Sequence, residues 1–136
     1  MQSSLCMLLG YAALTLLLVF IYVGYRVGLV LSMKVAANAW PRGAAGHPDP
    51  AFITRAQHAH LNCVENLPVV VTVVAVAFAL GKLELLNPLA GVFLGLRMGQ
   101  SLVHLISTSA AMVFIRANLF LAQLAILVYW IFLLVR

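Results

Sequence analysis

Seven polar side chains recur at helical spacing in two otherwise apolar parts of the sequence. In the stretch 55–65, an arginine, a histidine, an asparagine and a glutamate are spaced 3, 4 and 3 residues apart. In the stretch 97–104, an arginine, a glutamine and a histidine are spaced 3 and 4 residues apart. This spacing predicts one polar face on each of two helices. The two faces consist of Arg55, His58, Asn62 and Glu65, and of Arg97, Gln100 and His104.

These residue types are suited to binding a small anionic ligand. Arginine holds carboxylates in a bidentate manner and keeps its charge when it is desolvated. Glu65 adds an acceptor for a ligand amine, and a cation beside a ligand thiol favours the thiolate. Two more arginines, Arg26 and Arg116, fall near the ends of the flanking apolar segments. A ligand that carries carboxylates, an amine and a thiol would use all of these groups.

The sequence does not indicate a metal site. His58 and His104 can approach each other, but no acidic or thiol ligand completes a metal-binding set. Cys6 and Cys63 lie in different apolar segments, and we expect both to be buried thiols.

The composition places the chain in a membrane. Hydrophobic residues make up 65% of its 136 residues and charged residues 8%, with a mean hydropathy of +1.10. Long apolar segments of this kind indicate membrane spans. The net charge of +5 comes from scattered lysines and arginines. Such scatter is more typical of residues that set the membrane topology than of a surface that binds nucleic acid. We therefore expect no nucleic-acid partner.

Four apolar segments predict an all-α membrane protein with a four-transmembrane-helix bundle, forming one domain over residues 1–136. The expected spans cover about residues 5–30, 55–80, 88–106 and 117–135. In the second span the uninterrupted apolar run, residues 67–80, covers only about 21 Å of a hydrocarbon core of about 30 Å. The polar stretch before it is therefore drawn into the membrane, and Asn62 and Glu65 should lie below the surface.

The depths of the two polar faces agree. The second span enters from one side near Arg55 and the third span from the other side near Asn87, so Glu65 and Arg97 each lie about 15 Å deep. We expect these two residues to meet near the midplane, because an unpaired charge at that depth costs about 2.5–3.5 kcal/mol.

Basic residues set the expected orientation. The side that holds the link between spans one and two carries more of them than the opposite side, so the positive-inside rule places it in the cytoplasm. Both termini are then non-cytoplasmic, and the polar site lies near the cytoplasmic face. The residues compared are Lys34, Arg42, Arg55 and Arg116 on one side, and Lys82 and Arg136 on the other.

The stretch "RAQHAHLNCVENLP", with its Asn62-x-x-Glu65-x-x-Pro68 core, resembles the second-span signature of the MAPEG superfamily. The stretch "RMGQSLVH" resembles the third-span pattern of an arginine followed by polar residues three and seven positions later. These membrane-associated proteins act in eicosanoid and glutathione metabolism and include microsomal glutathione transferases. The resemblance extends over most of the chain.

The resemblance implies a homotrimer that binds glutathione between neighbouring protomers near the cytoplasmic face, with a hydrophobic or lipid co-substrate. It places Arg116 as the residue that stabilises the glutathione thiolate. The residues that would line the glutathione site are Arg26, Arg55, His58, Asn62, Glu65, Arg97, Gln100 and His104.

Three departures from the family pattern leave the activity open. His58 stands where catalytic members carry an arginine, Gln100 and His104 replace the usual aromatic or histidine positions, and the interval before Arg116 is longer. One interpretation is a glutathione transferase, with peroxidase activity on lipid hydroperoxides as an option. The alternative is a non-catalytic lipid-binding or scaffold protein of the same fold. A small four-span multidrug exporter is disfavoured, because such exporters carry their key glutamate in the first span and this chain has none there.

Overall fold

The computed structural model describes residues 3–41 and 45–136 of the chain. Arg42, one of the basic residues counted for orientation, lies outside the described residues. Four long α-helices confirm the all-α expectation, and all four are long and apolar enough to cross a membrane. The helices and one short 3-10 turn are α1 (Ser3–Leu31), α2 (Ala51–Ala79), η1 (Leu83–Leu85), α3 (Asn87–Ile106) and α4 (Ala110–Val135).

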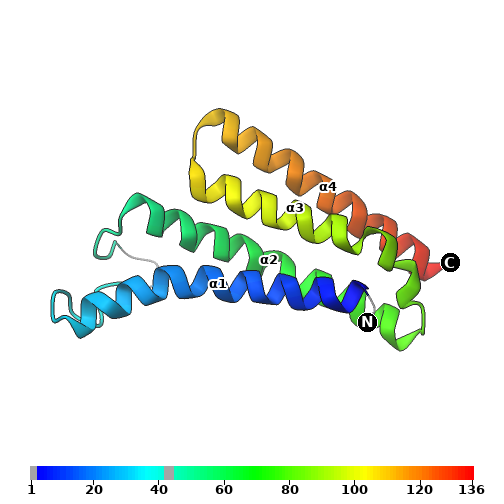
Figure 1. The fold of residues 1–136 in the computed structure, drawn as a ribbon, viewed down its shortest axis with the longest axis horizontal. Helices are drawn as coiled ribbons and strands as arrows, with labels where there is room; N and C mark the ends of the chain where they lie inside the picture. Colours follow the sequence, from blue (N-terminus) through cyan, green and yellow to red (C-terminus); the bar gives the residue numbers. More distant parts are fainter. Residues whose placement is uncertain (1–2, 42–44) are drawn as a thin grey trace.

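The helices form an up-and-down bundle in which α1 packs beside α2 and α3 beside α4 (Figure 1). The two termini and the α2–α3 turn lie at one end, which we call the terminal end. The described parts of the α1–α2 connecting segment, residues 32–41 and 45–50, and the α3–α4 link lie at the other end, which we call the loop end. The arrangement brings the start of α2, the end of α3 and the start of α4 together at the loop end.

Local signals explain where the helices begin. Pro50 precedes α2, and Pro88 occupies the first turn of α3, where a missing backbone N–H costs nothing. Ser109 caps α4, because its hydroxyl accepts a hydrogen bond from the Met112 backbone N–H at 3.5 Å. Helix α4 starts at Ala110 and α2 starts at Ala51, so each begins several residues before the span predicted within it.

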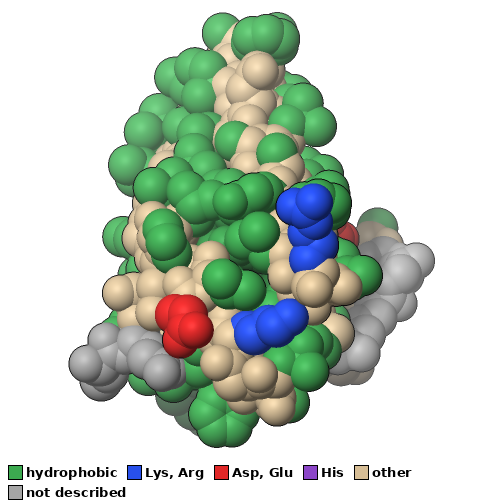
Figure 2. Space-filling view, turned by 90° about the vertical axis from the view of Figure 1, so that its right-hand side faces the viewer, with side chains coloured by type: hydrophobic (Ala, Val, Ile, Leu, Met, Phe, Trp, Pro, Cys, Tyr) green, Lys and Arg blue, Asp and Glu red, His purple; other side chains and the backbone are tan. Residues whose placement is uncertain are grey.

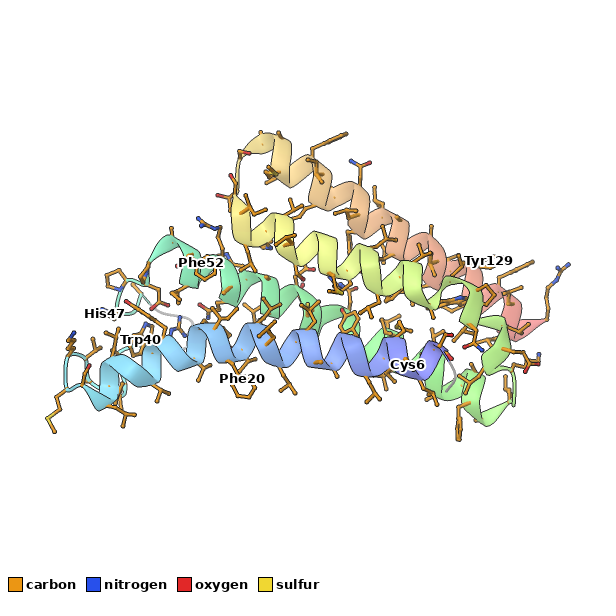
Figure 3. All side chains as sticks on the ribbon, in the orientation of Figure 1. Cys6, Phe20, Trp40, His47, Phe52 and Tyr129 are labelled. Atoms are coloured by element: carbon orange, nitrogen blue, oxygen red, sulfur yellow. The ribbon has the colours of Figure 1, made fainter. Side chains whose placement is uncertain are left out.

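The core of the bundle is aromatic between α1, α3 and α4. The Tyr11 and Phe93 rings lie 6.4 Å apart, and the Phe93 and Trp130 rings lie 5.3 Å apart. All three side chains are buried. Many large apolar side chains instead point outward, as Phe20 does on α1 (Figure 3). Figure 2 looks onto the terminal end, where hydrophobic side chains predominate and only a few charged ones appear. An apolar exterior of this extent is suited to lipid contact.

Candidate polar site within the bundle

Arg97 is the centre of a buried hydrogen-bond network in the middle of the bundle. Only 1% of the residue is exposed. Its Nη2 donates to the Tyr11 hydroxyl at 2.5 Å, and its Nη1 donates to Asn62 Oδ1 at 2.7 Å and to Gln100 Oε1 at 2.8 Å. The Arg97 guanidinium carbon also lies 5.0 Å from the centre of the Tyr11 ring, within cation–π range. One cation thus joins α1, α2 and α3.

Amide side chains extend this network to the fourth helix. Gln100 Nε2 donates to Asn62 Oδ1 at 3.2 Å. Gln123, on α4, donates from Nε2 to Gln100 Oε1 at 2.9 Å and to the Leu119 carbonyl at 3.0 Å. Gln100 and Gln123 are both buried. The network therefore contacts all four helices, and dipoles rather than an opposite charge balance Arg97.

The prediction that Glu65 contacts Arg97 is wrong. Among the described residues, the ion pair present joins Arg26 and Asp49, and Glu65 takes no part in one. The Glu65 side chain is instead exposed on the outer face of α2, three residues from the half-buried Asn62. The physical reason is the rotation around the helix axis. Three residues turn a helix by about 300°, so the side chains of Asn62 and Glu65 point in directions about 60° apart.

A second group of sequence-predicted residues gathers at the loop end. Arg55 donates from Nε to the Leu105 carbonyl near the end of α3, at 2.8 Å. The His58 and His104 rings lie 6.2 Å apart, so the expected approach of these two histidines is confirmed. Arg116 lies near the start of α4, the helix that packs against α3. We call Arg55, His58, His104 and Arg116 the cationic cluster.

The cationic cluster is accessible from outside the protomer. His58 is exposed, and the other three members are half-buried. Within the described part of the chain, no three histidine, cysteine, aspartate or glutamate side chains are grouped closely enough to hold a metal ion. Anion binding is the chemistry that the guanidinium groups of Arg55 and Arg116 favour.

Arg26 lies apart from both groups, in contacts that the sequence did not suggest. It donates to Asp49 Oδ2 from Nε at 2.9 Å and to Gln57 Oε1 from Nη2 at 2.8 Å. Its guanidinium carbon lies 5.3 Å from the centre of the Trp40 ring, and the Trp40 indole donates to Asp49 Oδ1 at 3.1 Å. Trp40 and His47 lie together beside the loop end of α1 (Figure 3).

These contacts border a polar cavity of about 980 Å³ between α1, the connecting segment and α2. Its lining includes Arg26, Asp49, Gln57 and His60. His60 also contacts the Thr15 carbonyl through Nδ1 at 3.2 Å. The structure thus divides the sequence-predicted residues among the buried network, the cationic cluster and this cavity, and it leaves Glu65 outside all three, on the outer face of α2.

Sequence reasoning missed Tyr11, Gln123 and Asp49. Each carried a signal, since Tyr11 and Gln123 are polar groups inside apolar spans, and Asp49 is one of only three acids in the chain. Buried polar groups in a membrane span need partners, so each isolated one indicates a contact with another helix.

Comparison with known proteins identifies the family of the chain. The family model described as the MAPEG family matches residues 4–136, nearly the whole chain. No curated protein and no solved structure matches the chain.

Proposed function

The chain belongs to the MAPEG family and is an integral, multi-pass membrane protein, and on that premise we propose that it is a glutathione transferase. Its second substrate would be a hydrophobic electrophile taken from the membrane. Lipid hydroperoxides form a further substrate class, reduced at the expense of two glutathione thiols. Family membership supports a role related to glutathione or eicosanoid metabolism, and the specific activity is our inference from the site.

The observation that carries the proposal is the exposure of Glu65 and His58 on α2. Polar and ionisable groups inside a membrane span are costly when they face lipid, and they mark functional sites by default. Within the described residues Glu65 has no cationic partner. A ligand ammonium group would supply one, and the cationic cluster, nearer the loop end, would bind the ligand's anionic groups.

The cationic cluster also suits the chemistry of a thiol. A guanidinium beside the glutathione sulfur favours the thiolate, and each unit of pKa lowering requires about 1.4 kcal/mol of stabilisation. The thiolate sulfur then forms a bond to the electrophilic carbon, while the thiol proton passes to solvent. We assign the thiolate contact to Arg116, because it is half-buried and donates to no acceptor among the described residues.

We further propose a homotrimer with glutathione held between neighbouring protomers. The exposed polar face of α2 supports this, because a second protomer would shield it from lipid. Arg26 and the cationic cluster lie on different sides of α2, so two protomers would be needed to bring both to one ligand. The basic residues at the loop end favour the cytoplasmic side for this end, with both termini on the opposite side.

One observation favours the non-catalytic alternative. Gln100 is buried, and its amide oxygen and nitrogen are both used inside the protomer. It is therefore not free to contact glutathione as a family residue at this position would. A lipid-binding or scaffold protein of this fold would retain the buried network and need no thiolate site.

Calorimetry with purified protein in detergent tests the proposal. The wild type should bind glutathione, develop thiolate absorbance in the ultraviolet and conjugate a standard electrophile. Arg116→Ala should retain binding and lower kcat/KM by about a hundredfold, the usual loss for one preorganised charge-stabilising donor. Arg136→Ala, which removes an exposed arginine at the terminal end, is the matched control. Absence of glutathione binding in the wild type would refute the transferase and favour the alternative.

A further inference from the structure

The buried network fixes which way each of its amide groups points. Arginine nitrogens only donate, and a backbone carbonyl only accepts. Gln123 must therefore turn its NH2 group toward the Leu119 carbonyl, and Gln100 must turn its oxygen toward Arg97 and Gln123. The NH2 group of Gln100 is then left to face Asn62.

The same logic orients Asn62. Its Oδ1 receives hydrogen bonds from Arg97 Nη1 at 2.7 Å and from Gln100 Nε2 at 3.2 Å. Both contacts require an acceptor, so the oxygen faces inward and the NH2 group faces away from the network. In residues 3–41 and 45–136, no acceptor meets Asn62 Nδ2, and this nitrogen is not among the buried unpaired atoms. It is therefore an open donor beside the exposed Glu65.

We propose that Arg97, Gln100 and Gln123 are positioning residues that hold the Asn62 amide as an outward-facing hydrogen-bond donor. The inference rests on the proposed function and specifies the ligand further. Asn62 takes an acceptor oxygen, a carboxylate or an amide carbonyl of the peptide, while the Glu65 carboxylate takes a donor. Gln123 acts from α4, the helix farthest along the chain, and touches no ligand itself.

Asn62→Asp separates this role from a structural one. The aspartate keeps both inward hydrogen bonds and gives Arg97 an opposite charge, but it cannot donate outward. We expect the melting temperature to stay level or rise, while glutathione affinity falls tenfold or more, as when a ligand acceptor faces an unmatched group. Asn118→Asp changes an exposed asparagine of α4 and should alter neither quantity. Wild-type affinity in Asn62→Asp would overturn the proposal.

Gln123→Met tests whether Gln123 influences the ligand through Gln100 and Asn62, because methionine has a similar length and no hydrogen-bond donor. Loss of one orienting hydrogen bond should weaken glutathione binding about three- to tenfold. In an Asn62→Asp background the same change should have no effect on affinity, because no outward NH2 group remains to be oriented.

If the two substitutions lower the glutathione affinity additively in the double variant, Gln123 does not act through Asn62, and the proposed function is unaffected. A wild type that binds no glutathione would refute both the function and the positioning role. Should Gln123→Met not fold, Asn62→Asp decides the question alone.

Discussion

Arg97 shows how a charge can be held in a membrane protein by neutral groups. Its partners are a phenol, two amide oxygens and the Asn62 backbone carbonyl at 3.3 Å, and within the described parts of the chain its Nε has no partner. A buried cation stripped of water is costly unless hydrogen bonds replace its hydration. Counting residues along the helices placed Arg97 level with Glu65, whereas the structure bonds Arg97 to Asn62, three residues earlier on α2. Direction around each helix depends on packing against its neighbours, and the sequence alone did not supply it for Glu65.

Tyr11→Phe should destabilise the protein by about 1–3 kcal/mol, because it removes the buried hydroxyl that donates to the Cys63 carbonyl and accepts a hydrogen bond from Arg97. Thermal unfolding in detergent, followed by circular dichroism, measures the change. Tyr129→Phe alters an exposed tyrosine of α4 and should have no effect beyond about 0.5 kcal/mol. Equal stabilities for the two variants would show that the Tyr11 hydroxyl contributes nothing to the network.

At the scale of elements, four spans could be predicted because apolar runs of sufficient length are a strong signal. The starts of helices were less predictable. The sequence places span four after the charged Arg116, whereas α4 begins at the Ser109 cap and continues through that arginine. Hydrophobicity determines which part of a helix lies in lipid, and capping determines where the helix begins, so the two boundaries need not agree.

Two helix ends adopt a left-handed backbone with different residues. Gly81, after α2, has φ of 65°, and Met33, after α1, has φ of 57°. Glycine tolerates this conformation, while a side chain is strained by about 1–2 kcal/mol.

Met33→Gly should therefore raise the melting temperature, with a gain of about 0.5–1 kcal/mol, and Gly81→Ala should lower it by a similar amount. Gly24→Ala is the control within α1, because a methyl group there meets no atom within 4 Å. A fall in stability for Met33→Gly would mean that the exposed methionine contributes contacts that outweigh its strain.

At the scale of the whole molecule, a single protomer leaves Glu65 uncovered within a membrane span. Association of protomers removes this cost, so we expect native mass spectrometry of detergent-extracted protein to give three copies of the chain. Replacing the exposed Val69 of the same α2 face by arginine should weaken the assembly, because it adds a buried charge to the interface. Phe114→Arg, on the exposed face of α4, is the control. A monomeric wild type that still binds glutathione would contradict the shared site.

The Arg97 network contains no carboxylate, since its acceptors are amides, a phenol and backbone carbonyls. Acidification has no acceptor there to neutralise, so the interior that joins the four helices should persist in an acidic compartment.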